Sequence, residues 1–271
     1  MITGGTDGIG AGLARHYLAQ GDTVVAIGRD EAKGAALARL GAHFVGADLS
    51  LVAENLRVVD LLANRFEAID ALILCARYFR SHRHETHEGF EACFALEYLS
   101  RFLLSHRLLP HLEAAPAPVI LNVSGPGAPK PEIRWEDLGF RHGYSGMEAQ
   151  FHAGRANDLL GLSFTAEHPD ARTRYVLVNP GSVASSFAGE FDPDTAALVR
   201  HMKRAAAPVD QIVPRLAALV DSPHADPVSA FVIDRPASPR ISGADDPAAA
   251  RLHRLTTELM ARRSGSGAHR T

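Results

Sequence analysis

The chain is poor in the features that mark several large classes of protein. It has only two cysteines, Cys75 and Cys93, both in apolar surroundings and without a Cys-x-x-Cys spacing, so a reduced protein with buried thiols fits better than a disulfide framework. No apolar run reaches the roughly 18 residues of a membrane span, and the N-terminus has no signal-peptide pattern. The net charge of −3 comes without a long basic run. We therefore expect a cytoplasmic protein that binds neither nucleic acid nor membranes.

What the chain does have is the composition and pattern of an α/β protein. Its 271 residues, 46% of them hydrophobic and 22% charged, are enough for one domain with a full core. Short apolar runs alternate with segments of helical period, which predicts a single doubly wound, Rossmann-type parallel sheet of about seven strands with helices on both faces. The domain should cover residues 1–262, and residues 263–271 have the composition of a disordered tail.

The expected elements follow from this alternation. We expect strands at 2–3, 23–27, 43–45, 71–75, 119–123, 174–178 and 228–233. We expect helices at about 9–20 (ended by Gly21), 30–40 (capped by Asp30), 50–66 (capped by Ser50), 88–112, 147–168, 209–220 and 247–262.

The most informative feature is the segment 3–10, which reads Thr-Gly-Gly-Thr-Asp-Gly-Ile-Gly between a short strand and a helix. A turn with so few β-carbons can lie close to a diphosphate, and the following helix offers unpaired N–H groups and the positive end of its dipole. This is a more widely spaced variant of the dinucleotide-binding Gly-x-Gly-x-x-Gly turn. The cofactor contacts expected here are Gly4, Thr6, Asp7, Gly8, Ile9 and Gly10.

The residue after the second strand indicates the type of cofactor. An acidic residue there would accept hydrogen bonds from the adenosine ribose 2′-hydroxyl, whereas an arginine pairs with a 2′-phosphate. This chain has Arg29, with Lys33 one turn further on. The pattern favours NADP(H) over NAD, and the alternative interpretation of Arg29 is a solvated charge at a strand end.

Later strand ends complete the predicted cofactor site. Asp48 and Leu49 end the third strand where an adenine amino group could be met, although Asp48 could also simply initiate a helix. The loop Asn179-Pro180-Gly181 follows the sixth strand and could cover the nicotinamide, with Ser185 bonding its amide. The other expected contacts in this loop are Pro180, Gly181 and Val183, and two more, Ala76 and Arg155, are implied only by the family resemblance that follows.

The chain resembles the short-chain dehydrogenase/reductase superfamily from residue 2 to about residue 262, in the turn at 3–10, Arg29, Asp48-Leu49, Asn122-Val123-Ser124 and Asn179-Pro180-Gly181. The segments 132–138, 102–104 and 246–247 look like the branch that contains retinol dehydrogenases and protochlorophyllide reductases. The resemblance implies a homodimer formed through the two long helices expected at 88–112 and 147–168.

The resemblance also implies a catalytic tyrosine, a lysine four residues later, a serine after the fifth strand and an asparagine in the long helix. The tyrosine donates a proton, the lysine lowers its pKa and holds the nicotinamide ribose, and the serine polarises the carbonyl. In this chain the four positions read Phe151, Arg155, Ser124-Gly125 instead of Ser-Ser, and Glu97. Phenylalanine cannot give a proton, and arginine can hold ribose hydroxyls but is a poor proton relay.

Two of these departures look coupled, because Glu97 and Arg155 could meet directly as an ion pair on the floor of the cleft. Arg77 stands where the family has the glycine of an Asn-Asn-Ala-Gly turn, and it could either hold the diphosphate or block the pocket.

Three residues could replace the tyrosine, and each has a structural alternative. Tyr144 could instead pack at the rim of the cleft, His152 could be a surface histidine, and Ser124 could satisfy backbone near its strand end. The histidines at 82, 84 and 87 lack a carboxylate or cysteine partner of convincing geometry, so no metal is expected.

Three functions remain open on these residues. The first is an atypical NADP(H)-dependent reductase of a carbonyl compound or quinone, in which positioning and a hydroxyl of the substrate, as in an aromatic polyketide, replace the missing acid. The second is a non-redox enzyme of the same fold, such as a cyclase, dehydratase or pericyclic catalyst. The third is an inactive NADP-binding protein.

Overall fold

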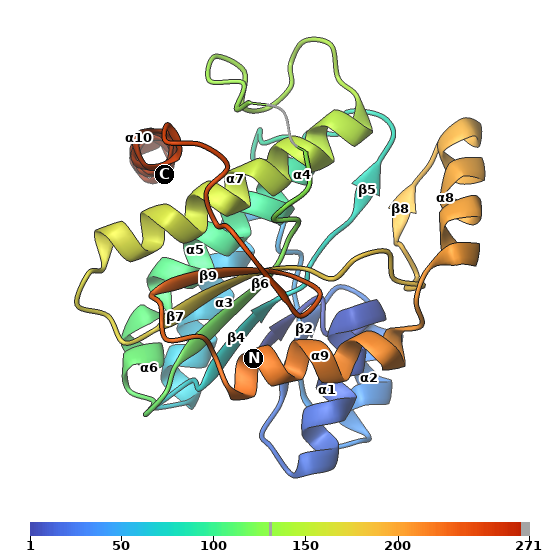
Figure 1. The fold of residues 1–271 in the computed structure, drawn as a ribbon, viewed down its shortest axis with the longest axis vertical. Helices are drawn as coiled ribbons and strands as arrows, with labels where there is room; N and C mark the ends of the chain where they lie inside the picture. Colours follow the sequence, from blue (N-terminus) through green and yellow to red (C-terminus); the bar gives the residue numbers. More distant parts are fainter. Residues whose placement is uncertain (130–131, 267–271) are drawn as a thin grey trace.

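The computed structural model describes residues 1–129 and 132–266, and it has the predicted doubly wound α/β architecture (Figure 1). The main sheet has eight strands, one more than expected, in the order β10-β9-β7-β6-β4-β1-β2-β3. Seven of them are parallel: β1 (Ile2–Thr3), β2 (Val25–Gly28), β3 (His43–Gly46), β4 (Ala71–Leu74), β6 (Val119–Val123), β7 (Arg174–Asn179) and β9 (Val228–Val232).

The eighth strand, β10 (Arg235–Ala237), runs antiparallel to β9 at the edge of the sheet. The sequence pattern missed it because it is short, largely exposed and centred on Pro236, which a central strand would not tolerate. The register of the parallel strands pairs Ile2 with Ala26 on one side and with Ile73 on the other. The two-residue strand β1 therefore lies in the middle of the sheet.

The helices lie on both faces of the sheet (Figure 1). They are α1 (Gly8–Gln20), α2 (Glu31–Ala38), α3 (Val52–Arg65), α4 (Ala92–Phe94), the π-helical turn η1 (Ala95–Leu99), α5 (Ser100–Arg107), α6 (Leu109–Glu113), α7 (Gly146–Glu167), α8 (Pro193–Ala205), α9 (Val209–Asp221) and α10 (Asp245–Ser266).

Alternation along the strands divides the core in two. Leu72 and Leu74 of β4 belong to the layer packed against α3, α5 and α7, whereas Ile73 faces the layer of α1 and α9. Both layers are buried, as the near-continuous apolar strands predicted.

Several helix boundaries differ from the sequence-based expectation. The helix expected at 88–112 begins only at Ala92, because the buried carboxylate of Glu91 caps it through Cys93 N and Phe94 N, and η1 interrupts it. Ser50 does not cap α3. The carboxylate of Glu88, from a distant loop, accepts from the N–H groups of 52 and 53 at 2.6 and 3.1 Å instead.

The C-terminal helix α10 lies across α7 (Figure 1). It is held by Leu252 in the core, by a 2.8 Å hydrogen bond between Thr256 and Tyr98, and by the ring contact of His253 with Phe102. The helix α10 therefore covers part of α7, one of the two helices through which the family resemblance implies a homodimer. The homodimer stays a prediction. The helix also continues through residues 263–266 of the expected tail, and 267–271 lie outside the described residues.

A small second sheet stands apart from the main one. Strands β5 (Phe79–Arg80) and β8 (Gly189–Glu190) pair in parallel beside α8, and neither these strands nor α8 was expected from the sequence. They join the loop after β4 to the loop after β7, which are distant in the chain (Figure 1).

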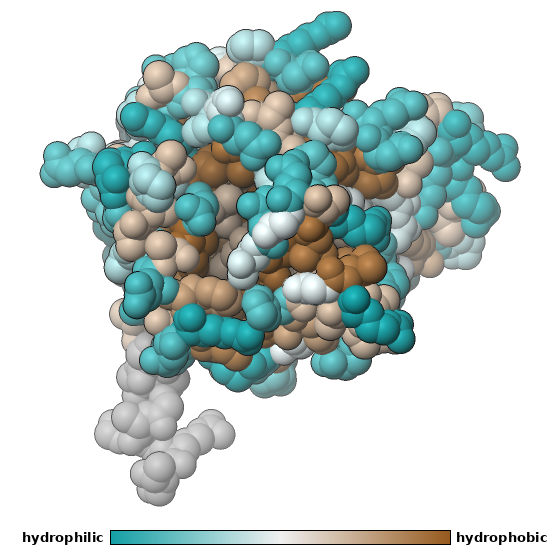
Figure 2. All heavy atoms as spheres, turned by 90° about the horizontal axis from the view of Figure 1, so that it is seen from below, coloured by the Kyte–Doolittle hydropathy of each residue, from teal (hydrophilic) through white to brown (hydrophobic). Residues whose placement is uncertain are grey.

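In Figure 2, hydrophobic side chains gather in the middle of the face shown and hydrophilic ones surround them. No helix in the described part of the chain is both long and apolar enough to cross a membrane.

Candidate functional site

The main cavity, with a volume of about 700 Å³, opens at the carboxyl ends of the parallel strands. It is lined by the residues that follow successive strands, among them Gly4 after β1, Arg29 after β2, Ala76 after β4, Ser124 after β6 and Gly181 after β7. The strand order reverses between β1 and β4, and open α/β sheets bind ligands at this kind of switch point.

The glycine turn forms one end of the cavity and leaves no room for side chains. A β-carbon on Gly4, which has a φ of 62°, would lie 2.9 Å from the backbone of Ala76, and one on Gly10 would lie 2.4 Å from the carbonyl oxygen of Gly4. The glycines around the start of α1 therefore border the cavity with backbone alone, and the N–H of Gly8 donates to Asp7 Oδ1. A helix N-terminus of this kind can receive a diphosphate.

Asp7 and Lys33 form an ion pair at this end of the cavity, and both line it. Asp7 also caps α1 by accepting from Gly8 N at 2.7 Å. Burial alone would raise the pKa of Asp7, but the hydrogen bonds from Lys33 and from Gly8 N hold it below its usual range. Lys33 therefore offsets a carboxylate that would otherwise repel a bound phosphate. From the sequence, we expected Lys33 to act together with Arg29 in favouring NADP(H).

Arg29 lines the cavity on the other side of the turn. Its guanidinium lies 4.7 Å from the ring centroid of Tyr78 and 3.9 Å from a carboxylate oxygen of Asp48, and 44% of its side chain is exposed. Asp48 itself does not line the cavity, because its Oδ1 accepts from the backbone and hydroxyl of Ser50. The contacts of Asp48 thus match the alternative interpretation, in which it initiates a helix. Leu49, by contrast, lines the cavity.

The structure brings together most of the residues expected to touch a cofactor. Besides those already named, the cavity is lined by Thr6, Gly8, Ile9, Pro180, Val183 and Ser185. Asp48 and Arg155 are the two expected contacts that do not line it.

Helix α7 presents a different face to the cavity from the one we expected. Its cavity-lining residues are Met147, Gln150, Phe151, Gly154 and Asn157, which share one face of a helix. Phe151 is therefore in place, but the residue four positions later, Arg155, points away. Gln150 and Gly154 are also four residues apart, and both of these positions line the cavity.

The expected ion pair between Glu97 and Arg155 is wrong. Arg155 donates two hydrogen bonds to Asp245 at the start of α10, at 2.7 and 3.1 Å. Glu97 instead faces the cavity, where its carboxylate accepts from Gln150 Nε2 at 2.6 Å and from Tyr78 N at 3.3 Å. Spacing alone could not choose between the two registers of α7, because both place a pair of residues one turn apart.

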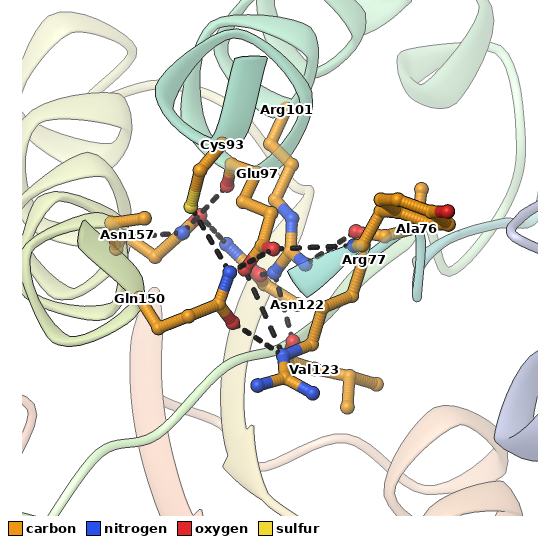
Figure 3. A network of polar contacts seen from close by, with 11 residues as sticks. Ala76, Arg77, Cys93, Glu97, Arg101, Asn122, Val123, Gln150 and Asn157 are labelled. Carbon is orange, nitrogen blue, oxygen red and sulfur yellow. Dashed lines mark hydrogen bonds and ion pairs between the residues drawn. The ribbon is translucent and has the colours of Figure 1, made fainter. Parts of the chain in front are cut away.

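Arg77 forms a polar cluster with Glu97 and Gln150 (Figure 3). Its Nε donates to Gln150 Oε1 at 2.6 Å and lies 4.0 Å from Glu97 Oε2. Its guanidinium also stacks over the ring of Phe187 at 4.3 Å. Arg77 therefore contacts α7, η1 and the loop after β7.

A second arginine, which the sequence did not single out, lies beneath the cluster. Arg101 is 3% exposed and lines the cavity. It donates to Asn122 Oδ1, to Val123 O at 2.8 Å and to Ala76 O at 3.0 Å. Burial lowers the pKa of this guanidinium, and nearby Glu97 opposes the shift. The only sequence signal was an arginine inside an otherwise apolar stretch of helix.

The three candidate replacements for the tyrosine have different fates. Ser124 lines the cavity and donates weakly to Asn122 O at 3.4 Å. Tyr144 does not line it, and its hydroxyl donates to Arg80 O at 3.1 Å. His152 is 1% exposed rather than on the surface, and it packs between Phe94 and Phe140. Burial lowers the pKa of His152 to about 4, so it is neutral near pH 7.

The remaining wall of the cavity is apolar. Seven large hydrophobic side chains are exposed among the described residues, and four of them line this cavity: Met147, Phe151, Leu198 and Met202. The last two belong to α8. Such a concentration at one mouth indicates a binding surface for an apolar group.

Comparisons with known proteins show the family of the chain. The family described as short chain dehydrogenase matches residues 1–136. Retinol dehydrogenase 12 of Mus musculus is 31% identical over 198 residues, which cover 68% of this chain and 61% of that protein. Oxidoreductase calI of Penicillium decumbens is 28% identical over 221 residues, which cover 73% of this chain and 61% of that protein. The chain thus spans about three fifths of the length of these relatives.

Solved structures share the fold. A short chain dehydrogenase from Burkholderia cenocepacia J2315 in complex with NADP has a TM-score of 0.64 at 20% identity, over 86% of this chain and 94% of that one. A 3-ketoacyl-(acyl-carrier-protein) reductase from Brucella melitensis complexed with NADH also has a TM-score of 0.64 at 20% identity, over 85% and 94% of the two chains.

Proposed function

Because the chain belongs to the short-chain dehydrogenase family, we propose that it is an oxidoreductase that uses NADP(H) to reduce an apolar carbonyl compound or quinone. The observation that carries the proposal is one continuous cavity with a bare-backbone glycine turn at one end and an apolar mouth at the other. A dinucleotide and an apolar substrate could meet between them, above Glu97 and Arg77.

The residues at the glycine end fit a nicotinamide coenzyme. The N-terminus of α1 and the backbone of Gly4 and Gly8 would receive the diphosphate. The partly exposed Arg29 would pair with a 2′-phosphate, which supports NADP(H) over NAD(H). When bound, the reduced nicotinamide supplies the hydride. The names of the two solved structures described above include NADP and NADH, which supports the coenzyme class.

The residues of this site support an unusual source for the proton that the reduced product takes up. Neither Gln150 nor Gly154 can act as a general acid. Among the described residues, Tyr78 is the one tyrosine that lines the cavity. Its ring lies against Arg29, and its hydroxyl donates to Glu190 at 3.4 Å. A general acid is worth roughly 10²–10⁴ in rate. Substrates that need none, or that carry their own acidic hydroxyl, are therefore favoured.

The direct test is coenzyme binding followed by turnover. Calorimetry should detect NADPH binding with a preference over NADH, and NADPH should be oxidised when apolar quinones or hydroxylated aromatic ketones are added. Conversion of a substrate with the nicotinamide unchanged would instead support the non-redox enzyme. Coenzyme binding without any turnover would support the inactive binding protein, and no binding of either coenzyme would contradict all three.

A further inference from the structure

We propose that Arg77 is the catalytic group that stabilises the charge formed on the substrate oxygen, and that the substrate class is a quinone rather than a simple ketone. This inference rests on the proposed oxidoreductase function. It follows from where the guanidinium lies, which of its donors are free, and what a guanidinium can and cannot do chemically.

The position of Arg77 is the first step. Its Nε donates to Gln150, on the cavity-facing side of α7, and the same contact places the guanidinium beside Glu97. Both partners line the cavity together with Arg77. The cation therefore extends from the loop after β4 to Gln150, and Gly154, one turn further along α7, lines the same cavity without a side chain.

The free donors are the second step. Among the described residues, Nε of Arg77 donates one hydrogen bond, to Gln150, and lies near Glu97, whereas neither terminal nitrogen has a hydrogen-bond partner. In Figure 3 these two nitrogens point away from Gln150 and Glu97. The side chain is 38% exposed, in contrast to 7% for Glu97. Two N–H groups in a fork are thus available to an oxygen in the cavity.

The guanidinium is also held in place before any ligand arrives. It stacks over Phe187, whose φ of 47° lies in the left-handed region that costs a bulky residue energy. Pairing of β5 with β8 ties the chain just after Arg77 to the chain just after Phe187. A preorganised donor needs no reorganisation when charge develops, which is the condition for electrostatic catalysis.

The local charge has the sign that an oxyanion requires. Arg77 and Arg101 are two cations and Glu97 is one anion, so these three cavity-lining residues together carry one net positive charge. The carboxylate of Glu97 is already occupied by Gln150 and the backbone of Tyr78. It positions Arg77 without neutralising the whole cluster.

The chemistry of the guanidinium selects the substrate. Addition of hydride to the carbonyl breaks the C=O π bond, and its electron pair becomes a lone pair on oxygen. Arg77 stabilises that anion but cannot release a proton near pH 7, so the proton must come from water. A ketone gives an alkoxide about as basic as hydroxide, since water has a pKa of about 15.7. A quinone instead accepts the hydride on one carbonyl oxygen. The π electrons then shift through the ring, which becomes aromatic, and the pair of the opposite C=O bond ends on the second oxygen as a phenolate. Phenols have a pKa of about 10. Only the phenolate is stable enough to leave before it is protonated.

Kinetics of two variants test the catalytic role. Arg77→Gln should lower kcat for quinones by about 10²–10³, the usual effect of removing one oxyanion donor, while the dissociation constant for NADPH changes little. Arg77→Lys keeps the charge but loses the fork, so its activity should be intermediate. Arg215→Gln, on the surface and outside the cavity, is the matched control and should retain wild-type turnover. A weakened NADPH affinity with unchanged kcat would overturn the proposal in favour of a coenzyme anchor.

A binding measurement separates this inference from the proposed function, because it requires no turnover. 4-Nitrophenol, whose phenolate absorbs visible light, should bind to the wild-type protein with its apparent pKa lowered, and Arg77→Gln should abolish the shift. A lowered pKa in both proteins, or in neither, would contradict the role of Arg77 even if NADPH is oxidised. A shift that depends on Arg77, in a protein that oxidises no NADPH, would retain the oxyanion site and refute the oxidoreductase.

Discussion

Arg155 on α7 and Asp245 at the start of α10 form an ion pair that is almost completely buried, with side chains 4% and 0% exposed. Asp245 also accepts hydrogen bonds from Ile241 N and Ser242 Oγ, at 2.7 and 2.9 Å. Burial alone would raise the pKa of Asp245, but these hydrogen bonds and those from Arg155 hold it far below its usual range. The charge expected to touch the coenzyme instead fastens the C-terminal helix.

This geometry predicts that Arg155→Ala acts on stability and not on the coenzyme. Removing one partner of a buried pair leaves an uncompensated charge and costs about 3–5 kcal/mol, measured as the free energy of unfolding in urea. Stability should also fall in the wild type as pH drops below the 3.8 of an ordinary aspartate, because the unfolded chain then takes up a proton that the folded one refuses.

Two comparisons sharpen the Arg155 experiment. Arg215→Ala removes an exposed pair with Asp234 and should cost less than about 1 kcal/mol. The double variant Arg155→Met/Asp245→Leu removes both charges and should recover much of the lost stability. A variant of Arg155 that keeps its stability but binds NADPH less tightly would show that the side chain reaches the cavity after all.

Arg29 should determine the choice between the two coenzymes. Arg29→Asp replaces a partner for the 2′-phosphate with an acceptor for the 2′-hydroxyl. Hydrogen bonds to charged groups are worth about 1.5–3 kcal/mol, so the affinity for NADPH should fall by roughly 10–100-fold and that for NADH should rise. Calorimetric titration of both coenzymes measures this. Arg39→Asp, on the exposed end of α2, changes the net charge equally and should leave the preference intact.

The lining of the cavity at its glycine turn could largely be predicted because its residues are fixed by backbone requirements that are local in sequence. The glycines at 4–10 are needed where the chain passes close to itself, and Arg29 follows directly from the end of β2. The strand β6 lies where the pattern placed it, at 119–123. Parallel strands ending at one edge then gather these residues without further information.

Other contacts could not be predicted because they join distant segments. The partner of Arg155 is ninety positions away, in a helix whose docking no local pattern describes. The cap of α3 comes from Glu88, thirty-six positions away, although Ser50 was the better local candidate. Helix α8 is amphipathic and starts with Asp192 and Pro193, signals of a helix start that the surrounding prolines obscured.

A cluster of three partly buried histidines predicts how stability depends on pH. Nδ1 of His106 on α5 lies 2.9 Å from Nε2 of His168, and its ring contacts that of His253 on α10. Burial, reinforced by the other two histidines, lowers the pKa of His106 from 6.5 to about 3. In the unfolded chain this histidine takes up a proton as pH falls below 6.5, whereas the folded protein refuses it. The free energy of unfolding should therefore decrease by about 1–3 kcal/mol between about pH 7 and pH 4.

The histidine prediction is checked by comparing slopes rather than single values. Urea unfolding across this pH range should give a shallower decline for His106→Leu than for the wild type, because the variant has lost the group that titrates differently in the two states. His16→Leu removes a partly exposed histidine on α1, outside this cluster, and should leave the slope unchanged. Equal slopes for wild type and His106→Leu would contradict the assignment.

The register of α7 predicts which substitutions can rebuild the pattern that the chain has lost. Gln150→Tyr with Gly154→Lys, combined with Arg77→Gly to remove the competing cation, would place a proton donor and a lysine on the cavity-facing side of the helix. Reduction of a simple ketone by NADPH should then rise by about 10²-fold, the lower end of what a general acid contributes. The matched triple variant Arg77→Gly/Phe151→Tyr/Arg155→Lys puts its lysine against Asp245, so it should gain little and lose stability. A larger gain from this second variant, or none from the first, would mean that the carbonyl does not bind above Gln150 and Gly154.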